Sequence, residues 1–133
     1  MILGVIGIIS GGDDSKENSQ EQSLTIEWNE EDQKGYVEFD QELEDGYVKK
    51  WVISSYYDNI ATLLETVNKD TLKDYEYIEF KANLKKEDGK IYGVIKGDLS
   101  IDFIKNYENF SSSSAKLDVE ENMENLFLPS FLE

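Results

Sequence analysis

Three residue types that support much enzyme chemistry are missing from this 133-residue chain. It has no cysteine and no histidine, and all thirteen of its cationic residues are lysines. The lack of cysteine excludes disulfides and thiolate metal sites, and the lack of histidine removes the usual general base and zinc ligand. Without arginine, bidentate clamps for phosphate or carboxylate groups are excluded as well. We therefore expect no catalytic residue, cofactor or metal centre, and a protein that is not an enzyme.

Positive charge is scarce, and the acidic residues are unevenly distributed. The formal net charge is −16. Residues 13–45 hold thirteen acidic residues against two lysines, residues 46–110 hold eleven against ten, and residues 111–133 hold five against one. The middle of the chain is thus nearly neutral. Because binding to phosphates needs a cationic face, we expect no nucleic-acid partner.

The beginning of the chain changes abruptly from apolar to polar. Residues 1–9 carry no charge, and residues 10–22 contain no apolar side chain beyond glycine. This pattern predicts a partial membrane anchor or signal remnant, followed by a disordered acidic tether. Nine helical residues span only about 14 Å of a hydrocarbon core about 30 Å thick. Three interpretations therefore stay open: part of a longer anchor, an apolar strand or helix packed on the domain, and a weak interfacial or degenerate signal segment.

Residues 23–133 predict a single α+β domain with a mainly antiparallel sheet of about five strands. Alternating apolar and polar residues predict strands in four segments, which are residues 24–28, 35–39, 75–84 and 91–99. Residues 47–53 fit a further strand after a turn at Asp45-Gly46, and they also fit the opening of the next helix. Residues 116–119 are compatible with a short edge strand.

Two helices are expected in this domain. Residues 54–69 carry a stripe of apolar side chains at helical spacing, with Ser54 or Ser55 available as the N-cap. Residues 100–109 predict a shorter helix, which Ser100 would cap.

The segment between these two helices predicts a hairpin. Its first strand should turn one alternating set of side chains inward, namely Ile78, Phe80, Ala82 and Leu84. Gly93 and Gly97 on its second strand should leave room for side chains packed against the sheet.

The end of the chain is unusually apolar. Residues 125–132 hold five large apolar side chains around Pro129, whereas terminal tails are usually polar. We expect this tail to dock on the domain. A partner-binding peptide and a lipid-contacting tail remain the alternatives.

Aromatic side chains are the candidate binding residues. The chain contains two tryptophans, eight tyrosines and six phenylalanines, most of which strand and core positions explain. Those left exposed would form a patch typical of protein- or glycan-binding surfaces. The candidate partner-binding residues are Tyr47, Trp51, Tyr57, Tyr75, Tyr77, Tyr92 and Phe131.

An apolar end, an acidic tether and a small α+β domain containing residues 74–80 and 88–95 follow one another along the chain. This order resembles small membrane-anchored surface proteins and lipoproteins of Gram-positive bacteria and their prophages. The resemblance rests on overall organisation without a diagnostic motif, and the chain departs from it by lacking a lipidated cysteine. It implies a location and a binding role, and it transfers no functional residue.

Together these patterns predict a non-enzymatic interaction protein with a protein partner. The domain would lie outside the cell membrane, touching it only through the N-terminal segment, and a prophage or other mobile element would encode it. Without a tether the protein would be cytoplasmic. The alternative function is a cytosolic acidic inhibitor that mimics nucleic acid.

Overall fold

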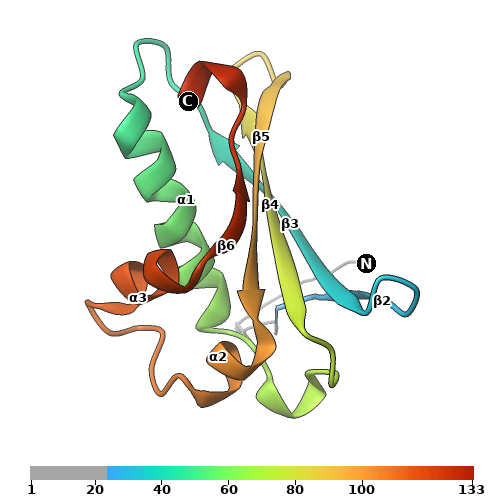
Figure 1. Ribbon diagram of the computed structural model, residues 1–133. Coiled ribbons are helices and arrows are strands. Elements are labelled where there is room, and N and C mark those ends of the chain that lie inside the picture. The colour runs from blue at the N-terminus through green and yellow to red at the C-terminus, as the bar shows by residue number, and fades with distance from the viewer. Residues whose placement is uncertain (1–23) are drawn as a thin grey trace, which may run out of the picture.

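A five-stranded mixed sheet is the framework of the computed structural model, which describes residues 24–133 (Figure 1). The strands are β2 (Glu27–Asn29), β3 (Lys34–Glu42), β4 (Tyr77–Lys85), β5 (Ile91–Ser100) and β6 (Glu124–Phe127), and they lie side by side in that order. The helices are α1 (Lys49–Leu64), α2 (Ile101–Asn106) and α3 (Ala115–Asn122), with short 3₁₀ turns η1 (Lys69–Thr71) and η2 (Ser130–Leu132).

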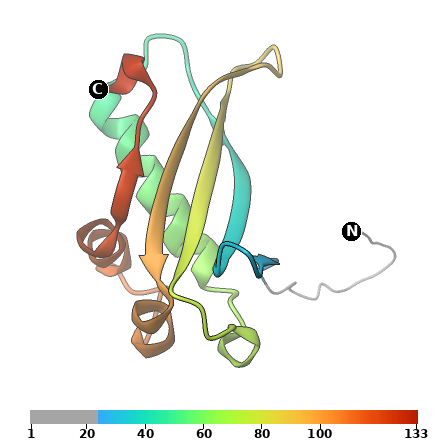
Figure 2. The same ribbon diagram turned by 45° about the vertical axis from the view of Figure 1, so that its right-hand side comes forward.

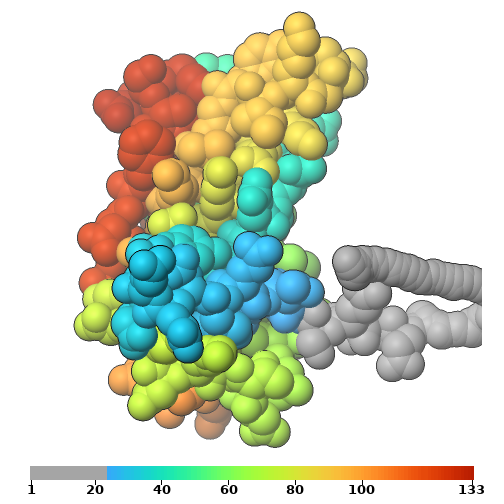
Figure 3. Space-filling view, turned by 90° about the vertical axis from the view of Figure 1, so that its right-hand side faces the viewer, coloured from blue at the N-terminus to red at the C-terminus, as the bar shows by residue number. Residues whose placement is uncertain are grey.

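The expected α+β class with a mainly antiparallel sheet is confirmed. The pairings β2–β3, β4–β5 and β5–β6 are antiparallel, whereas β3 and β4 run parallel. A parallel pair needs a crossover connection, and α1 supplies it by running along one face of the sheet (Figure 2). Among residues 24–133, no α-helix covers the opposite face, which we call the helix-free face, and strands form its surface behind the β2–β3 turn (Figure 3).

The expected anchor at residues 1–9 and the expected tether at residues 10–22 lie outside the described residues. Within residues 24–133, no helix combines the length and the apolar character needed to cross a bilayer.

The first helix begins earlier than its apolar stripe suggested. It starts at Lys49 rather than at residue 54 and ends at Leu64 rather than at residue 69, so a strand over residues 47–53 is wrong and the helical alternative is correct. Its N-cap is Val48, which makes no side-chain cap hydrogen bond, in place of Ser54 or Ser55.

Packing against the sheet explains this early start. In the helical conformation Val52 and Tyr56 share the inward face with Ile60, and all three side chains are buried. Gly46 has a φ of 72°, the left-handed conformation expected for it, but the chain continues from this turn into α1 instead of returning as a hairpin.

The inner face of the sheet packs under α1 as the alternation in β4 predicts. Ile78, Phe80, Ala82 and Leu84 are all fully buried. The hydroxyl of Tyr56 donates a hydrogen bond of 2.7 Å to the backbone carbonyl of Phe80, so that the helix is joined to the central strand by a polar contact as well.

Close packing at the two strand glycines is confirmed. A Cβ atom at Gly97 would lie 2.5 Å from the sulfur of Met123, and one at Gly93 would lie 2.9 Å from the ring of Phe131. The expected cap of the second helix is confirmed too, because the Ser100 side chain accepts a hydrogen bond from the Phe103 amide. This helix ends at residue 106, shorter than the predicted 100–109.

The C-terminal part of the chain corrects one expectation and confirms another. Residues 116–119 lie in helix α3, so an edge strand there is wrong, and the edge strand on that side is β6 instead. The apolar tail docks on the domain, because Leu132 in η2 is buried in the core.

Candidate functional site

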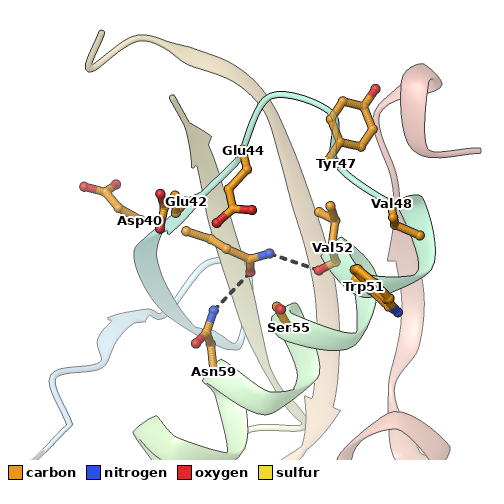
Figure 4. Close-up of a pocket in the computed structure, with 10 residues that line it drawn as sticks. Asp40, Glu42, Glu44, Tyr47, Val48, Trp51, Val52, Ser55 and Asn59 are labelled. Carbon is orange, nitrogen blue, oxygen red and sulfur yellow. Dashed lines mark hydrogen bonds between the residues drawn. The ribbon is translucent and has the colours of Figure 1, made fainter. Parts of the chain in front are cut away.

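A groove lies where the C-terminal end of β3 meets the first turns of α1 (Figure 4). Its volume is about 450 Å³. Figure 4 shows carboxylates from β3 and the following loop on one side and larger side chains from the start of α1 on the other. We call it the Trp51 groove. Its acidic wall consists of Asp40, Glu42 and Glu44, and its apolar wall consists of Tyr47, Val48 and Trp51.

Local structure explains how these side chains come to border one groove. Alternation along β3 turns Gln41 toward α1 and turns Asp40 and Glu42 to the opposite face of the sheet, so that Glu44 is the carboxylate on the same side as Trp51 (Figure 4). On α1, residues Trp51 and Asn59 lie eight positions apart and therefore share one side of the helix, next to the buried stripe. The groove thus lies along the line where the strand end and this side of the helix approach one another.

Trp51 is the most prominent side chain of this surface. It is 65% exposed, the highest fraction among the large exposed apolar residues of the described chain. Exposing so much aromatic surface to water is unfavourable, and tryptophan is enriched among the residues that dominate binding energy at protein interfaces.

The floor of the groove is formed by two side-chain amides. Gln41 is only 5% exposed, and its Nε2 donates a hydrogen bond of 2.9 Å to the carbonyl of Val52. Its Oε1 accepts a hydrogen bond of 3.2 Å from Nδ2 of Asn59 (Figure 4). Within residues 24–133, the second N–H of Gln41 and the Oδ1 of Asn59 have no hydrogen-bond partner, so the floor retains one donor and one acceptor.

The C-terminal tail packs against the apolar wall. The rings of Tyr47 and Phe131 meet edge to face, with centroids 5.7 Å apart. Lys49, in the first turn of α1, donates a hydrogen bond of 3.2 Å to the backbone carbonyl of Glu133. The last residues of the chain therefore hold the loop that borders the groove.

Two of the carboxylates around the groove already have a cationic partner. Lys85 lies 2.9 Å from Asp40, and its ammonium group lowers the pKa of that carboxyl. Lys86 forms an ion pair of 3.2 Å with Asp45. Glu42 and Glu44 form no ion pair with any residue of the described part of the chain.

A second hollow of about 660 Å³ adjoins the groove and shares Glu42 and Glu44 with it. Tyr92 on β5 borders this hollow, and its hydroxyl donates a hydrogen bond of 2.5 Å to Asp88. Lys86 lies over the Tyr92 ring at 4.8 Å. Asp45 and Glu87 line this hollow as well, so acidic residues continue from the groove around this end of the molecule.

The structure brings together only part of the predicted aromatic set. Tyr47 and Trp51 line the groove, Phe131 supports it, and Tyr92 lies in the adjoining hollow. Tyr57 is buried on α1 and belongs to the core.

The other two predicted tyrosines lie away from the groove. Tyr75 packs edge to face on Trp28, with ring centroids 5.6 Å apart. The Tyr77 hydroxyl donates a hydrogen bond of 3.1 Å to Glu124 on the helix-free face of the sheet.

The sequence patterns do not indicate the polar residues of the groove. Neither Glu44 nor Gln41 belongs to the candidate residues that the sequence indicates. A signal was available, since alternation along β3 places Gln41 on the inward side with Val37, and a polar side chain there needs a specific partner.

The groove combines an exposed tryptophan, carboxylates and two side-chain amides. Among residues 24–133, no three acidic side chains are grouped so as to hold a metal ion. Comparisons with family models, curated proteins and solved structures find no match for this chain.

Proposed function

We propose that this chain is a non-enzymatic protein-interaction domain that binds its partner through the Trp51 groove. The observation that carries the proposal is the exposure of Trp51, at 65%, beside a groove of about 450 Å³. A solvent-exposed tryptophan next to a concave surface with polar groups at its floor is the arrangement that interface hot spots favour.

A binding role suits the chemistry of the groove better than a catalytic one. Its carboxylates on Glu42 and Glu44 are exposed to solvent, whereas a carboxylate pair that acts as acid and base needs an apolar pocket to separate its pKa values. The chain has no histidine or cysteine that could act with them. Recognition of a partner uses the same groups without any such requirement.

The charge pattern of the sheet favours the groove over mimicry of nucleic acid. A mimic presents rows of unpaired carboxylates in place of phosphates, but carboxylates on the helix-free face alternate with lysines. Asp98 lies 3.0 Å from Lys34, and Asp40 lies 2.9 Å from Lys85. Local pairing of this kind weakens the field that would attract a basic DNA-binding protein.

Site-specific photocrosslinking in cells that express the protein from its native locus tests this proposal. A photoreactive aromatic amino acid replaces Trp51 in one variant and Leu117 in a control, because Leu117 is a similarly exposed apolar residue on α3 at 59%. We expect protein adducts from position 51 only. Excess wild-type domain should abolish them, and excess Trp51→Ala domain should not. Identical adducts from both positions would contradict the proposal.

Membrane tethering is a separate proposal, because it concerns residues 1–22. Fractionation of the same cells tests it. Recovery of the whole protein in the cytosolic fraction would overturn tethering and leave the groove proposal unaffected.

A further inference from the structure

We propose that the occupant of the Trp51 groove is an extended, lysine- or arginine-bearing segment of the partner protein. This inference rests on the function proposed above and names the chemistry of the partner. Three features of the groove support it, which are the carboxylates and the floor groups that have no partner among residues 24–133, and the apolar wall.

Charge complementarity selects a cationic occupant. Glu44 faces the groove, and Glu42 borders it from the helix-free side of β3. Neither has a lysine partner in the described part of the chain, while neighbouring Asp40 and Asp45 are each paired. A lysine or arginine side chain entering from solvent would meet Glu44 in the groove and Glu42 at the neighbouring edge of β3, neither of them paired within residues 24–133. An acidic segment would meet repulsion from the same groups, which disfavours it as the partner.

The floor selects an extended backbone. Gln41 is more than nine-tenths buried and keeps one N–H without an acceptor among residues 24–133, and Asn59 keeps its carbonyl oxygen without a donor there. A peptide group offers one acceptor and one donor, the complement of this pair. Leaving a buried amide donor unsatisfied is costly, so a backbone carbonyl that accepts from Gln41 removes an existing penalty.

The apolar wall fits apolar side chains of the occupant that alternate with its cationic ones. Val48 is 39% exposed beside Trp51, and the two project from the same end of α1. An apolar side chain of the occupant can pack on this wall while its cationic neighbour reaches the acidic wall or the Trp51 ring face. Successive side chains of an extended segment point to opposite sides, which matches two walls of opposite character.

Binding of three short fluorescent peptides to the purified domain tests the inference. Each peptide has about nine residues and two leucines. They differ only at two alternating positions, which are both lysine in the first peptide, both glutamine in the second and both glutamate in the third. We expect the lysine peptide to bind about tenfold more tightly than the glutamine peptide at about 0.05 M salt, and this advantage to shrink at about 0.5 M salt. The glutamate peptide should bind most weakly.

Two variants of equal charge locate the effect. Glu42→Gln with Glu44→Gln should weaken the lysine peptide about fivefold and leave the glutamine peptide unchanged. Glu30→Gln with Glu31→Gln removes the same charge at the β2–β3 turn, beside the opposite end of β3, and should change neither peptide by more than about twofold. Trp51→Ala should weaken both peptides about tenfold.

Each contrary result has a distinct meaning. Equal effects of the two double variants, or equal binding of lysine and glutamine peptides, overturn the cationic occupant and leave the groove as a docking surface. No effect of Trp51→Ala on peptides that do bind overturns the groove itself and the proposed function with it. No binding of any peptide overturns the inference, while crosslinking still decides the proposed function.

Discussion

Two neighbouring tyrosines on α1 show how one hydroxyl changes the role of a buried side chain. Tyr56 and Tyr57 are both buried, and burial raises the pKa of each phenol. Only Tyr56 has a hydrogen-bond partner among the described residues, the carbonyl of Phe80 at 2.7 Å. The contact joins α1 to the central strand in the middle of the core.

Replacing Tyr56 by phenylalanine should therefore destabilise the domain. We expect a loss of about 1 kcal/mol in the free energy of unfolding, because a buried hydrogen bond disappears while the ring remains. Tyr57→Phe is the matched control and should change this free energy by less than about 0.5 kcal/mol. Urea unfolding followed by circular dichroism measures both. Equal losses in the two variants would show that the hydrogen bond of the Tyr56 hydroxyl does not stabilise the domain.

At the scale of elements, the C-terminal tail is part of the folded structure. It adds β6 to the edge of the sheet, and η2 then places Leu132 in the core at 3% exposure. Phe131 packs against Tyr47 in the loop before α1. The C-terminal tail therefore contacts the groove's apolar wall at Tyr47.

Leu132→Ala should cost about 2–4 kcal/mol of unfolding free energy, because it leaves a cavity in the core. Leu126→Ala removes the same atoms from a residue that is 39% exposed on β6 and should cost less than about 1 kcal/mol. Denaturant titrations of both proteins measure the difference. Similar losses at both positions would mean that the tail is not anchored through Leu132.

At the scale of the whole molecule, one lysine links three strands across the helix-free face. Lys34 of β3 lies 3.3 Å from Glu79 of β4 and 3.0 Å from Asp98 of β5. Asn125 beside them donates a hydrogen bond of 2.9 Å to Asp98, which is only 4% exposed. Burial acts to lower the pKa of Lys34, but the hydrogen bonds and charges of Asp98 and Glu79 outweigh it, and that pKa is raised.

Lys34→Met should destabilise the domain by about 2 kcal/mol at neutral pH, because Asp98 loses its cation while remaining buried. A raised pKa means that the ion pair stabilises the fold fully below the unfolded value of 10.5 and stops doing so as pH rises through the folded value. The difference between wild type and variant should thus be constant from about pH 6 to pH 9 and shrink near pH 11.

Lys81→Met is the control for this prediction. Lys81 lies 4.0 Å from Glu38, and both side chains are more exposed than those of the Lys34 pair. The control should change the unfolding free energy by less than about 0.5 kcal/mol. Urea unfolding at three pH values compares the proteins. A difference for Lys34→Met that stays unchanged at high pH would contradict the assigned ion pair.

Much of the fold could be predicted because it depends on short-range patterns. Alternation along β4 identified the inward set that includes Phe80, and Ser100 was identified as a cap from its place before a short apolar stripe. The groove was harder to predict from the sequence. Its aromatic members Tyr47 and Trp51 were named as candidates, but Gln41, Glu42 and Glu44 were not assigned to any site.

The sequence by itself determined the absence of cysteine, histidine and arginine chemistry, the uneven charge and the α+β class, because composition and periodicity belong to the chain alone. Only the tertiary structure decided that residues 47–53 open a helix, that β3 and β4 pair in parallel, and that Glu44 and the end of β3 border one groove with Trp51. The spacing of residues 47–53 fits both a strand and a helix. Burial of Val52 and Tyr56 against the sheet selects the helix, and that choice aligns Trp51 with the end of β3.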